Sequence, residues 1–268
     1  MLDRPAKRLL QVKVSLVVLV TLLTTIVIKP VDAQIETQKS VTPPSRSTLN
    51  EPIRRQESNG TTVILPASYD EEKTYPALIL LPWTGGTPVD YFRGAFAEQY
   101  RTRIENSFIL ILPDVQGSLN DYTPPKNFRS TIKRYENLVR SDLDVLIPKY
   151  NIDESRVALG GYSLGGDLSW ELSLRNPGLF SGTIVISSKS HHRDESSMLQ
   201  LAAKNSRFFM LIDEEDKGRI PRMRDAVEEL ARYNVIHRFE IVPGADHYNI
   251  STPREVLMRG VDYVLFTE

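Results

Sequence analysis

The sequence predicts an α/β fold in which a mostly parallel sheet is covered on both faces by helices. Short continuous apolar runs at residues 77–81 and 108–112, and a further buried-strand pattern at 183–187, alternate with amphipathic segments of helix length. Continuous apolar runs are typical of strands that are buried on both faces, as in parallel sheets. The alternation of such strands with helices predicts parallel strands joined by crossover helices.

The remaining elements follow the same alternation. Residues 61–65 are expected to form an edge strand, and further buried strands are expected at 156–160, 208–212 and 239–242. Helices are expected at 91–106, 133–149, 168–174, 221–233 and 253–266. Each of the last two helices begins with a proline, at a position where proline is tolerated.

The first 33 residues have the pattern of a secretory signal peptide. A basic stretch over residues 4–13 precedes the uncharged apolar residues 14–28, and Val31-Asp32-Ala33 resembles a cleavage site. The apolar stretch is shorter than the roughly 20 residues that span a bilayer. Cleavage near Ala33 is therefore favoured over an uncleaved anchor, and we expect a periplasmic or extracellular protein without stable membrane association.

Composition places one globular domain at residues 59–268. Residues 34–58 are polar, include Pro43-Pro44 and lack apolar periodicity, which predicts a disordered linker. The net charge is −1, and removal of residues 1–33, with their five basic and two acidic side chains, makes it −4. An acidic mature chain has no electrostatic footprint for nucleic acid. The chain has no cysteine, which excludes disulfides and a cysteine nucleophile.

The segment Gly161-Tyr162-Ser163-Leu164-Gly165 has the form G-x-S-x-G and lies between a predicted strand and a predicted helix. At such a turn the serine is held in a strained backbone conformation with its oxygen above the sheet. The flanking glycines leave room where a Cβ atom would clash. Ser163 is therefore the expected nucleophile; the alternative is a turn that only packs the helix against the strand.

An acidic residue and a histidine follow Ser163 in the chain, each after a predicted strand. The run 213–216 reads Asp-Glu-Glu-Asp and follows the strand at 208–212, and His247 follows the strand at 239–242. Serine, acid and histidine in this order are the triad order of α/β-hydrolases. A neutral imidazole can take the serine proton, and a carboxylate orients the imidazole and stabilises its charged form.

The stretch 150–166, continued by 176–182, resembles the secreted, lidless esterases of the α/β-hydrolase superfamily. The similar groups are feruloyl, acetylxylan and polyhydroxyalkanoate-depolymerase-like esterases, and the phospholipase/carboxylesterase group. The resemblance runs from Thr61 to the C-terminus. The short connection between Ile186 and Phe208 leaves no room for a large lid domain.

The resemblance implies the roles of the site residues. Ser163 corresponds to the nucleophile, His247 to the base and Asp216 to the acid, because the acid of the family lies a few residues beyond its strand. Asp213 is the competing acid. A carboxylate beside His247 is expected to raise its pKa, so that kcat/KM falls as the pH drops through roughly 6 to 7.5.

The oxyanion hole is expected to use the amide of Leu164 and one amide from the loop at 82–86. That loop usually begins with His-Gly in the family, whereas here Pro82-Trp83 takes its place. Thr84 is favoured as the second donor, with Trp83 next. Trp83 and Tyr122 are also expected to bind substrate, and Tyr91 and Tyr248 are expected near the mouth of the site.

The other candidate residues favour structural roles. His191, His192 and His237 are expected at exposed positions, Asp246 in solvent, and Trp170 in the core. The acidic run at 213–216 has no calcium-loop spacing after it, so no metal is expected. The predicted chemistry requires no cofactor.

The sequence therefore predicts an exported serine hydrolase that cleaves carboxylic esters through an acyl-enzyme intermediate. The expected substrate is a small-molecule or polysaccharide-linked ester. An acyltransferase or a serine peptidase with the same three residues is an alternative. A binding module on a hydrolase fold without catalysis is an alternative of another class. Acyl and alcohol specificity and oligomeric state stay open.

Overall fold

A computed structural model of the chain describes residues 51–103, 105–122, 125–244, 246–247 and 254–267. All of the described residues belong to one compact unit, which spans residues 46–268. The expected signal peptide, the linker up to residue 50 and Tyr248 lie outside the described residues. Within the described part of the chain, no helix has the length and apolar character needed to cross a membrane.

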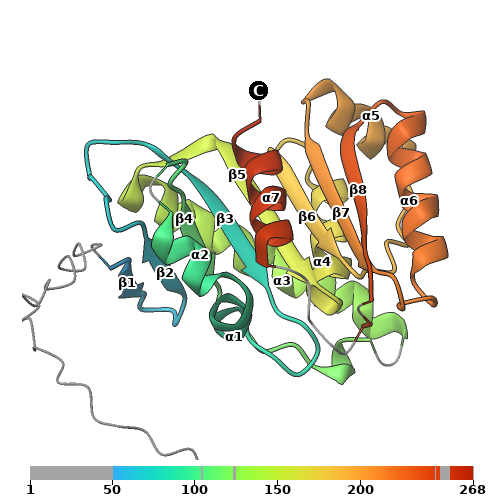
Figure 1. The fold of residues 1–268 in the computed structure, drawn as a ribbon, viewed down its shortest axis with the longest axis horizontal. Helices are drawn as coiled ribbons and strands as arrows, with labels where there is room; N and C mark the ends of the chain where they lie inside the picture. Colours follow the sequence, from blue (N-terminus) through green and yellow to red (C-terminus); the bar gives the residue numbers. More distant parts are fainter. Residues whose placement is uncertain (1–50, 104, 123–124, 245, 248–253, 268) are drawn as a thin grey trace, which may run out of the picture. The chain divides into compact units, whose positions relative to one another are not determined.

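One eight-stranded sheet forms the centre of the domain (Figure 1). Its strands lie in the order β1-β2-β4-β3-β5-β6-β7-β8. The pairs β1–β2 and β2–β4 are antiparallel, and the pairs from β4 to β8 are parallel. The strands are β1 Ile53–Gln56, β2 Thr62–Leu65, β3 Tyr75–Leu81, β4 Ile109–Leu112, β5 Ile152–Tyr162, β6 Gly182–Ile186, β7 Arg207–Asp213 and β8 Ile236–Val242.

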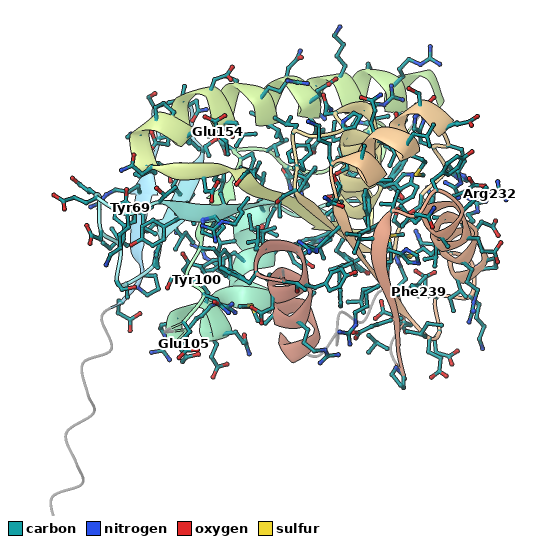
Figure 2. The ribbon with its side chains drawn as sticks, turned by 90° about the horizontal axis from the view of Figure 1, so that it is seen from above. Tyr69, Tyr100, Glu105, Glu154, Arg232 and Phe239 are labelled. Carbon is teal, nitrogen blue, oxygen red and sulfur yellow. The ribbon has the colours of Figure 1, made fainter. Side chains whose placement is uncertain are left out.

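Helices cover both faces of this sheet, as the view in Figure 2 shows. One face carries α1 (Pro88–Tyr91), the π-helical turn η1 (Phe92–Phe96), α2 (Ala97–Thr102) and α7 (Arg254–Leu265). The other face carries α3 (Pro125–Tyr150), α4 (Leu164–Arg175), α5 (Glu195–Ala203) and α6 (Ile220–Arg232). A short 3₁₀ turn, η2 (Leu119–Asp121), precedes α3.

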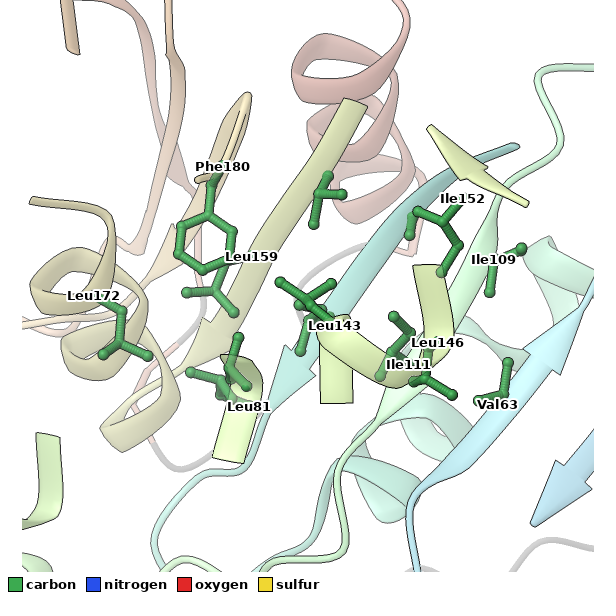
Figure 3. Close-up of a cluster of buried hydrophobic side chains, with 14 of the residues drawn as sticks. Val63, Leu81, Ile109, Ile111, Leu143, Leu146, Ile152, Leu159, Leu172 and Phe180 are labelled. Carbon is green, nitrogen blue, oxygen red and sulfur yellow. The ribbon is translucent and has the colours of Figure 1, made fainter. Parts of the chain in front are cut away.

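The core under α3 and α4 shows why these segments fold as they do (Figure 3). Leu143 and Leu146 of α3 meet side chains of the sheet such as Leu81, Ile111 and Leu159, and all five are at most 3% exposed. Burial of one such aliphatic side chain contributes about 1.5–3 kcal/mol. The buried apolar side chains therefore stabilise the central strands, and these strands anchor the loops at their carboxyl ends.

The structure confirms the predicted fold class and extends it at one edge. Ile53–Gln56 falls within the segment expected to be a linker, yet it forms β1 and pairs with β2. The sheet therefore starts before the expected boundary at residue 59, and β2 is not the edge strand. Three of the four β1 residues are exposed, so β1 lacks the apolar pattern by which the other strands were predicted.

The connection between β6 and β7 also agrees with the expectation of no large lid. It contains the nine-residue helix α5, which was not predicted, and no inserted domain. Met198 and Leu201 of α5 pack beside Trp170, which is fully buried in the core as expected. The carboxyl ends of β6 and β7 are therefore joined to the next elements by loops and α5, without an inserted domain.

Candidate active site

Ser163 lies in a strained turn between β5 and α4. Its backbone angles are φ 56° and ψ −112°, a left-handed conformation that is rare for any residue other than glycine. The Ser163 amide donates to the carbonyl of Ile186 at 2.9 Å. A Cβ atom at Gly165 would lie 2.6 Å from the carbonyl oxygen of Leu81, so only glycine fits. The turn is thus held against both neighbouring strands, β3 and β6.

A line of hydrogen bonds runs from Ser163 to a buried carboxylate. The Oγ of Ser163 is 3.0 Å from Nε2 of His247. The Nδ1 of His247 is 2.8 Å from Oδ2 of Asp216. Asp216 is only 6% exposed. Three loops, after β5, β7 and β8, therefore bring together a hydroxyl, an imidazole and a carboxylate in an order that can activate the hydroxyl.

The two candidate acids have different partners. Asp213 is the last residue of β7, is buried, and accepts a hydrogen bond from Oγ of Ser187 at 3.0 Å. The amide of Asp216 donates to the carbonyl of Asp213 at 3.1 Å, which closes a turn. That turn carries Asp216 beyond the strand end and toward His247. Asp216 is therefore the candidate that contacts the imidazole.

Arg219 is a residue of the site that the sequence analysis did not identify. Its Nη1 lies 3.2 Å and 3.3 Å from the two carboxylate oxygens of Asp216, and its backbone amide donates to the Asp216 carbonyl at 3.0 Å. The Asp216 carboxylate is thus shared between His247 and a guanidinium. The spacing of three residues between Asp216 and Arg219 was the only signal for this pair in the sequence.

The pKa of His247 is lowered from its ordinary value, chiefly because the imidazole is partly buried and next because of the Arg219 charge. The Asp216 carboxylate opposes both effects. This differs from the expectation that the carboxylate raises the pKa, because that expectation included neither the burial nor Arg219. The ring of Tyr162 stacks on the imidazole with centroids 5.3 Å apart. His247 is therefore neutral at neutral pH and able to accept a proton.

The structure places the two residues whose amides were expected to bind an oxyanion: Leu164 follows Ser163 in the chain, and Thr84 lines the same pocket as Ser163. Leu164 is the first residue of α4, where the amide has no acceptor within its helix. The loop containing Thr84 is tied to Gly117, since the Gly85 amide donates to the Gly117 carbonyl at 2.9 Å. Among the described residues, the hydrogen bonds of this loop do not use the Thr84 amide. Thr84 and Ser163 line the same pocket.

This pocket has a volume of about 1010 Å³ and opens above Ser163. Trp83 and Tyr122, which were expected to bind substrate, line this pocket. Residues 116–120 of the loop after β4 also line it, and this was not predicted. Its lining consists of Trp83, Thr84, Gly85, Gln116, Gly117, Ser118, Leu119, Asn120, Tyr122, Tyr162, Ser163, Lys189, Arg219 and His247. Tyr91 was expected near the mouth, but it is 3% exposed and packs edge-on against Trp83.

Tyr122 forms a fixed wall of the pocket. Its hydroxyl donates to Asp167 of α4, and its ring stacks on Phe128 with centroids 5.2 Å apart. Burial, followed by the Asp167 charge, raises the pKa of Tyr122 far above its ordinary value, so the phenol stays neutral. Asp167 is itself buried and also accepts from Oγ of Ser188 at 2.7 Å.

The other histidines form hydrogen bonds with residues other than Ser163. Nε2 of His191 is 2.7 Å from Nη1 of Arg222, and the carbonyl of His192 accepts from the Trp170 indole at 3.1 Å. His191 and Asp246 are exposed, as expected, whereas His192 and His237, which were also expected at exposed positions, are half-buried. The ring of His237 lies on the edge strand β8, where its Nδ1 is 2.8 Å from the Val235 carbonyl. Over the described ranges, no group of three or more His, Cys, Asp or Glu residues is suited to hold a metal ion.

Comparisons with known proteins agree with this architecture. A ferulic acid esterase superposes with a TM-score of 0.58 at 16% identity, over 80% of this chain and 96% of that chain. The feruloyl esterase module from Clostridium thermocellum superposes with a TM-score of 0.55 at 15% identity, over 84% and 93% of the two chains. An S-formylglutathione hydrolase from Staphylococcus aureus gives 0.57 at 17% identity, over 80% and 95%. At these identities the likeness shows a common fold.

A search of curated proteins gives no match. The model of the phospholipase/carboxylesterase family, however, matches residues 114–252, which are just over half of the chain and include Ser163, Asp216 and His247. The match spans the elements from the end of β4 to the loop after β8. The chain therefore belongs to the phospholipase/carboxylesterase family of α/β-hydrolases.

Proposed function

We propose that the protein hydrolyses carboxylic esters with Ser163 as nucleophile, His247 as general base and Asp216 as the acid that orients His247. The observation that carries this proposal is the pair of hydrogen bonds, 3.0 Å from Ser163 to His247 and 2.8 Å from His247 to Asp216. The strained backbone of Ser163 adds support, since strain of this kind is retained where it serves function.

In the first half of the reaction, Oγ of Ser163 attacks the ester carbonyl while Nε2 of His247 takes the hydroxyl proton. The carbonyl oxygen becomes an oxyanion, which the amides of Leu164 and Thr84 stabilise. Collapse of the tetrahedral intermediate breaks the bond to the alcohol oxygen, and the imidazolium donates its proton to that oxygen. The products of this half are the free alcohol and an acyl group bound to Ser163.

In the second half, His247 takes a proton from water, and the resulting hydroxide attacks the acyl carbonyl. Breakdown of the second tetrahedral intermediate returns the proton to Ser163 and releases the carboxylic acid. The pocket, without a lid domain between β6 and β7, supports access of water and of soluble esters, either free or linked to a polysaccharide. We therefore propose hydrolysis of short soluble esters without activation at a lipid interface.

The nucleophile is tested by Ser163→Ala with Ser155→Ala, at an exposed position of β5, as the matched control. The Ser163 variant should lose activity on 4-nitrophenyl acetate by about 10⁴-fold or more, and a fluorophosphonate probe should no longer label it. The Ser155 variant should keep both. Labelling of the Ser163→Ala protein, or activity within tenfold of the wild type, would overturn the proposal.

We further propose that residues 1–33 direct export and that the mature chain begins near Gln34. The basic, apolar and small-residue segments of the N-terminus support this. Expression of the full chain followed by N-terminal sequencing of the protein outside the cytoplasm should find the new end near Gln34. Recovery of an intact Met1 in the membrane fraction would contradict the proposal and indicate an anchor.

A further inference from the structure

The charged side chains that line the pocket above Ser163 are positive. Lys189 and Arg219 line it, and none of its described lining residues is Asp or Glu. Three carboxylates beside this surface are buried: Asp216 is 6% exposed and bonded to His247 and Arg219, Asp167 is 5% exposed, and Asp121 is 5% exposed and paired with Arg134. Lys189 and Arg219 thus line the pocket, whereas these three carboxylates do not.

The loop that carries Lys189 is built in an unusual way. Ser187, Ser188 and Ser190 are at most 1% exposed, and Lys189 is the partly exposed residue among them. Ser187 and Ser190 have positive φ angles of 47° and 44°, which cost energy in residues other than glycine. The loop is nevertheless fixed, because Asp167 accepts hydrogen bonds from the Ser188 hydroxyl and the Lys189 amide. A rigid, strained loop thus presents one lysine to the pocket.

The charged atoms of Lys189 and Arg219 retain unused donors. The Nζ of Lys189 lies 4.0 Å from the centroid of the Tyr122 ring, and among the described residues it has no carboxylate within ion-pair distance. Arg219 bonds to Asp216 through Nη1. In the described part of the chain, Nε and Nη2 of Arg219 have no acceptor. Both side chains therefore have donors left for an anionic ligand.

We propose that Lys189 and Arg219 form an anion-binding subsite beside Ser163, so that the preferred substrates are esters whose acyl or alcohol part carries a carboxylate. This inference rests on the proposed ester hydrolysis at Ser163. A carboxylate accepts charge-assisted hydrogen bonds from an ammonium and a guanidinium, which are stronger than neutral ones. Trp83 and the exposed Leu119 supply apolar surface in the same pocket for the uncharged part of the ester.

The test compares esters that differ only in charge. The acyl side is tested with 4-nitrophenyl hydrogen adipate against 4-nitrophenyl methyl adipate, and the alcohol side with 4-acetoxybenzoate against its methyl ester. For one of the two pairs, kcat/KM should be about tenfold higher for the anionic ester, through a lower KM. The preference should shrink as salt is added. Equal kcat/KM within both pairs would overturn the subsite and leave ester hydrolysis intact.

Variants at Lys189 separate charge from packing. Lys189→Met should remove most of the preference and Lys189→Arg should keep it, when the preference is measured within each protein as the ratio of kcat/KM for the anionic ester to kcat/KM for the neutral ester. Lys217→Met serves as the matched control, because Lys217 is exposed and pairs with Glu215 outside the pocket. A loss on neutral and anionic esters alike in Lys189→Met would show a structural role only and would overturn the proposal.

A binding measurement distinguishes failure of the subsite from failure of the proposed reaction. In calorimetry, the Ser163→Ala protein should bind monomethyl adipate more tightly than dimethyl adipate, and adding Lys189→Met should abolish the difference. This readout requires no turnover. Selective binding without hydrolysis by the wild type would overturn the proposed function but support the subsite. Equal binding within this pair, together with equal binding of 4-acetoxybenzoate and its methyl ester, would overturn the subsite.

Discussion

The turn that holds Ser163 and the turn that holds Asp216 reach the same site by different physical means. The Ser163 turn is defined by steric exclusion: a Cβ at Gly165 would meet backbone atoms of Leu81 at 2.6 Å and 2.9 Å. The Asp216 turn is defined by hydrogen bonds, from the Asp216 amide to Asp213 and from Arg219 to the Asp216 carboxylate. The first turn fixes the position of Ser163 and the second that of Asp216, but only the Ser163 turn requires residues without side chains.

This difference determines how easily each turn can be recognised from the amino-acid sequence. Exclusion demands glycine at defined positions, so Gly161 and Gly165 single out Ser163 as the candidate nucleophile. Hydrogen bonding to a carboxylate is satisfied by several arrangements, so Asp213 and Asp216 looked similar before the fold was known. We therefore expect substitutions in the Ser163 turn to act by displacing its backbone. Substitutions in the Asp216 turn should act by changing the charge beside His247 or the orientation of its imidazole.

The largest effect is expected for the Asp216 turn. Asp216→Asn removes the charge that orients and stabilises the His247 imidazolium, and kcat should fall by about 10⁴-fold. Asp213→Asn is the matched control, because an asparagine can still accept from Ser187, and its kcat should stay within about tenfold of the wild type. Steady-state kinetics on 4-nitrophenyl acetate measure both. The reverse order of the two losses would assign the acid role to Asp213.

The Ser163 turn should respond to a single added methyl group. Gly165→Ala places a Cβ against the Leu81 backbone, which cannot move away cheaply, so kcat should fall by about 100-fold through misplacement of Ser163. Gly160→Ala is the control, because there the nearest atoms are side-chain carbons at 3.3 Å or more. Kinetics with circular dichroism of both proteins test this. Full activity in Gly165→Ala would refute steric control of the turn.

The pH response measures the environment of His247. The pKa of His247 is lowered from its ordinary value of 6.5, so the midpoint of the acid limb of the kcat/KM profile should lie below pH 6.5. A pH profile of kcat/KM from pH 4.5 to 8 checks this. A midpoint above 6.5 would show that Asp216 outweighs burial and Arg219.

The smallest effect is expected from Arg219. Removing its charge in Arg219→Gln should raise the pKa of His247 and shift the acid limb of the kcat/KM profile toward higher pH. Arg219→Lys keeps a positive charge and should leave the limb nearer to that of the wild type. The same pH titration with a neutral ester gives the answer. An unchanged limb in Arg219→Gln would show that burial alone lowers the pKa.

The central strands of the sheet could be predicted from the sequence, whereas the edge strand β1 could not. Strands such as β3 and β4 are buried along their whole length, so their apolar runs were visible. The strand β1 reads Ile-Arg-Arg-Gln and has one partly buried residue, so it looked like part of the linker. Its position depends on pairing with β2, a tertiary contact that leaves no local pattern.

In the site, the sequence predicted residues with a motif and missed those brought in by the fold. Ser163, His247 and the two acids follow predicted strands in a known order. Lys189 and Arg219 belong to no motif, and they line the same pocket because the loops after the adjacent parallel strands β6 and β7 lie at the same edge of the sheet. Tyr91 was misplaced, because an aromatic residue near a loop gives no sign of whether it packs inward.

The two outer strands have a consequence for how the protein behaves at high concentration. An open sheet ends in unpaired backbone groups that invite another strand to add on. Here β1 carries Arg54 and Arg55 and β8 carries Arg238, all exposed. At β1, a second molecule that added its own edge in register would bring like charges together, whereas at β8 Arg238 pairs with Glu240 of the same strand. We therefore expect the arginines of β1 to disfavour edge-to-edge pairing, and replacing Arg54 and Arg55 with threonine should promote aggregation.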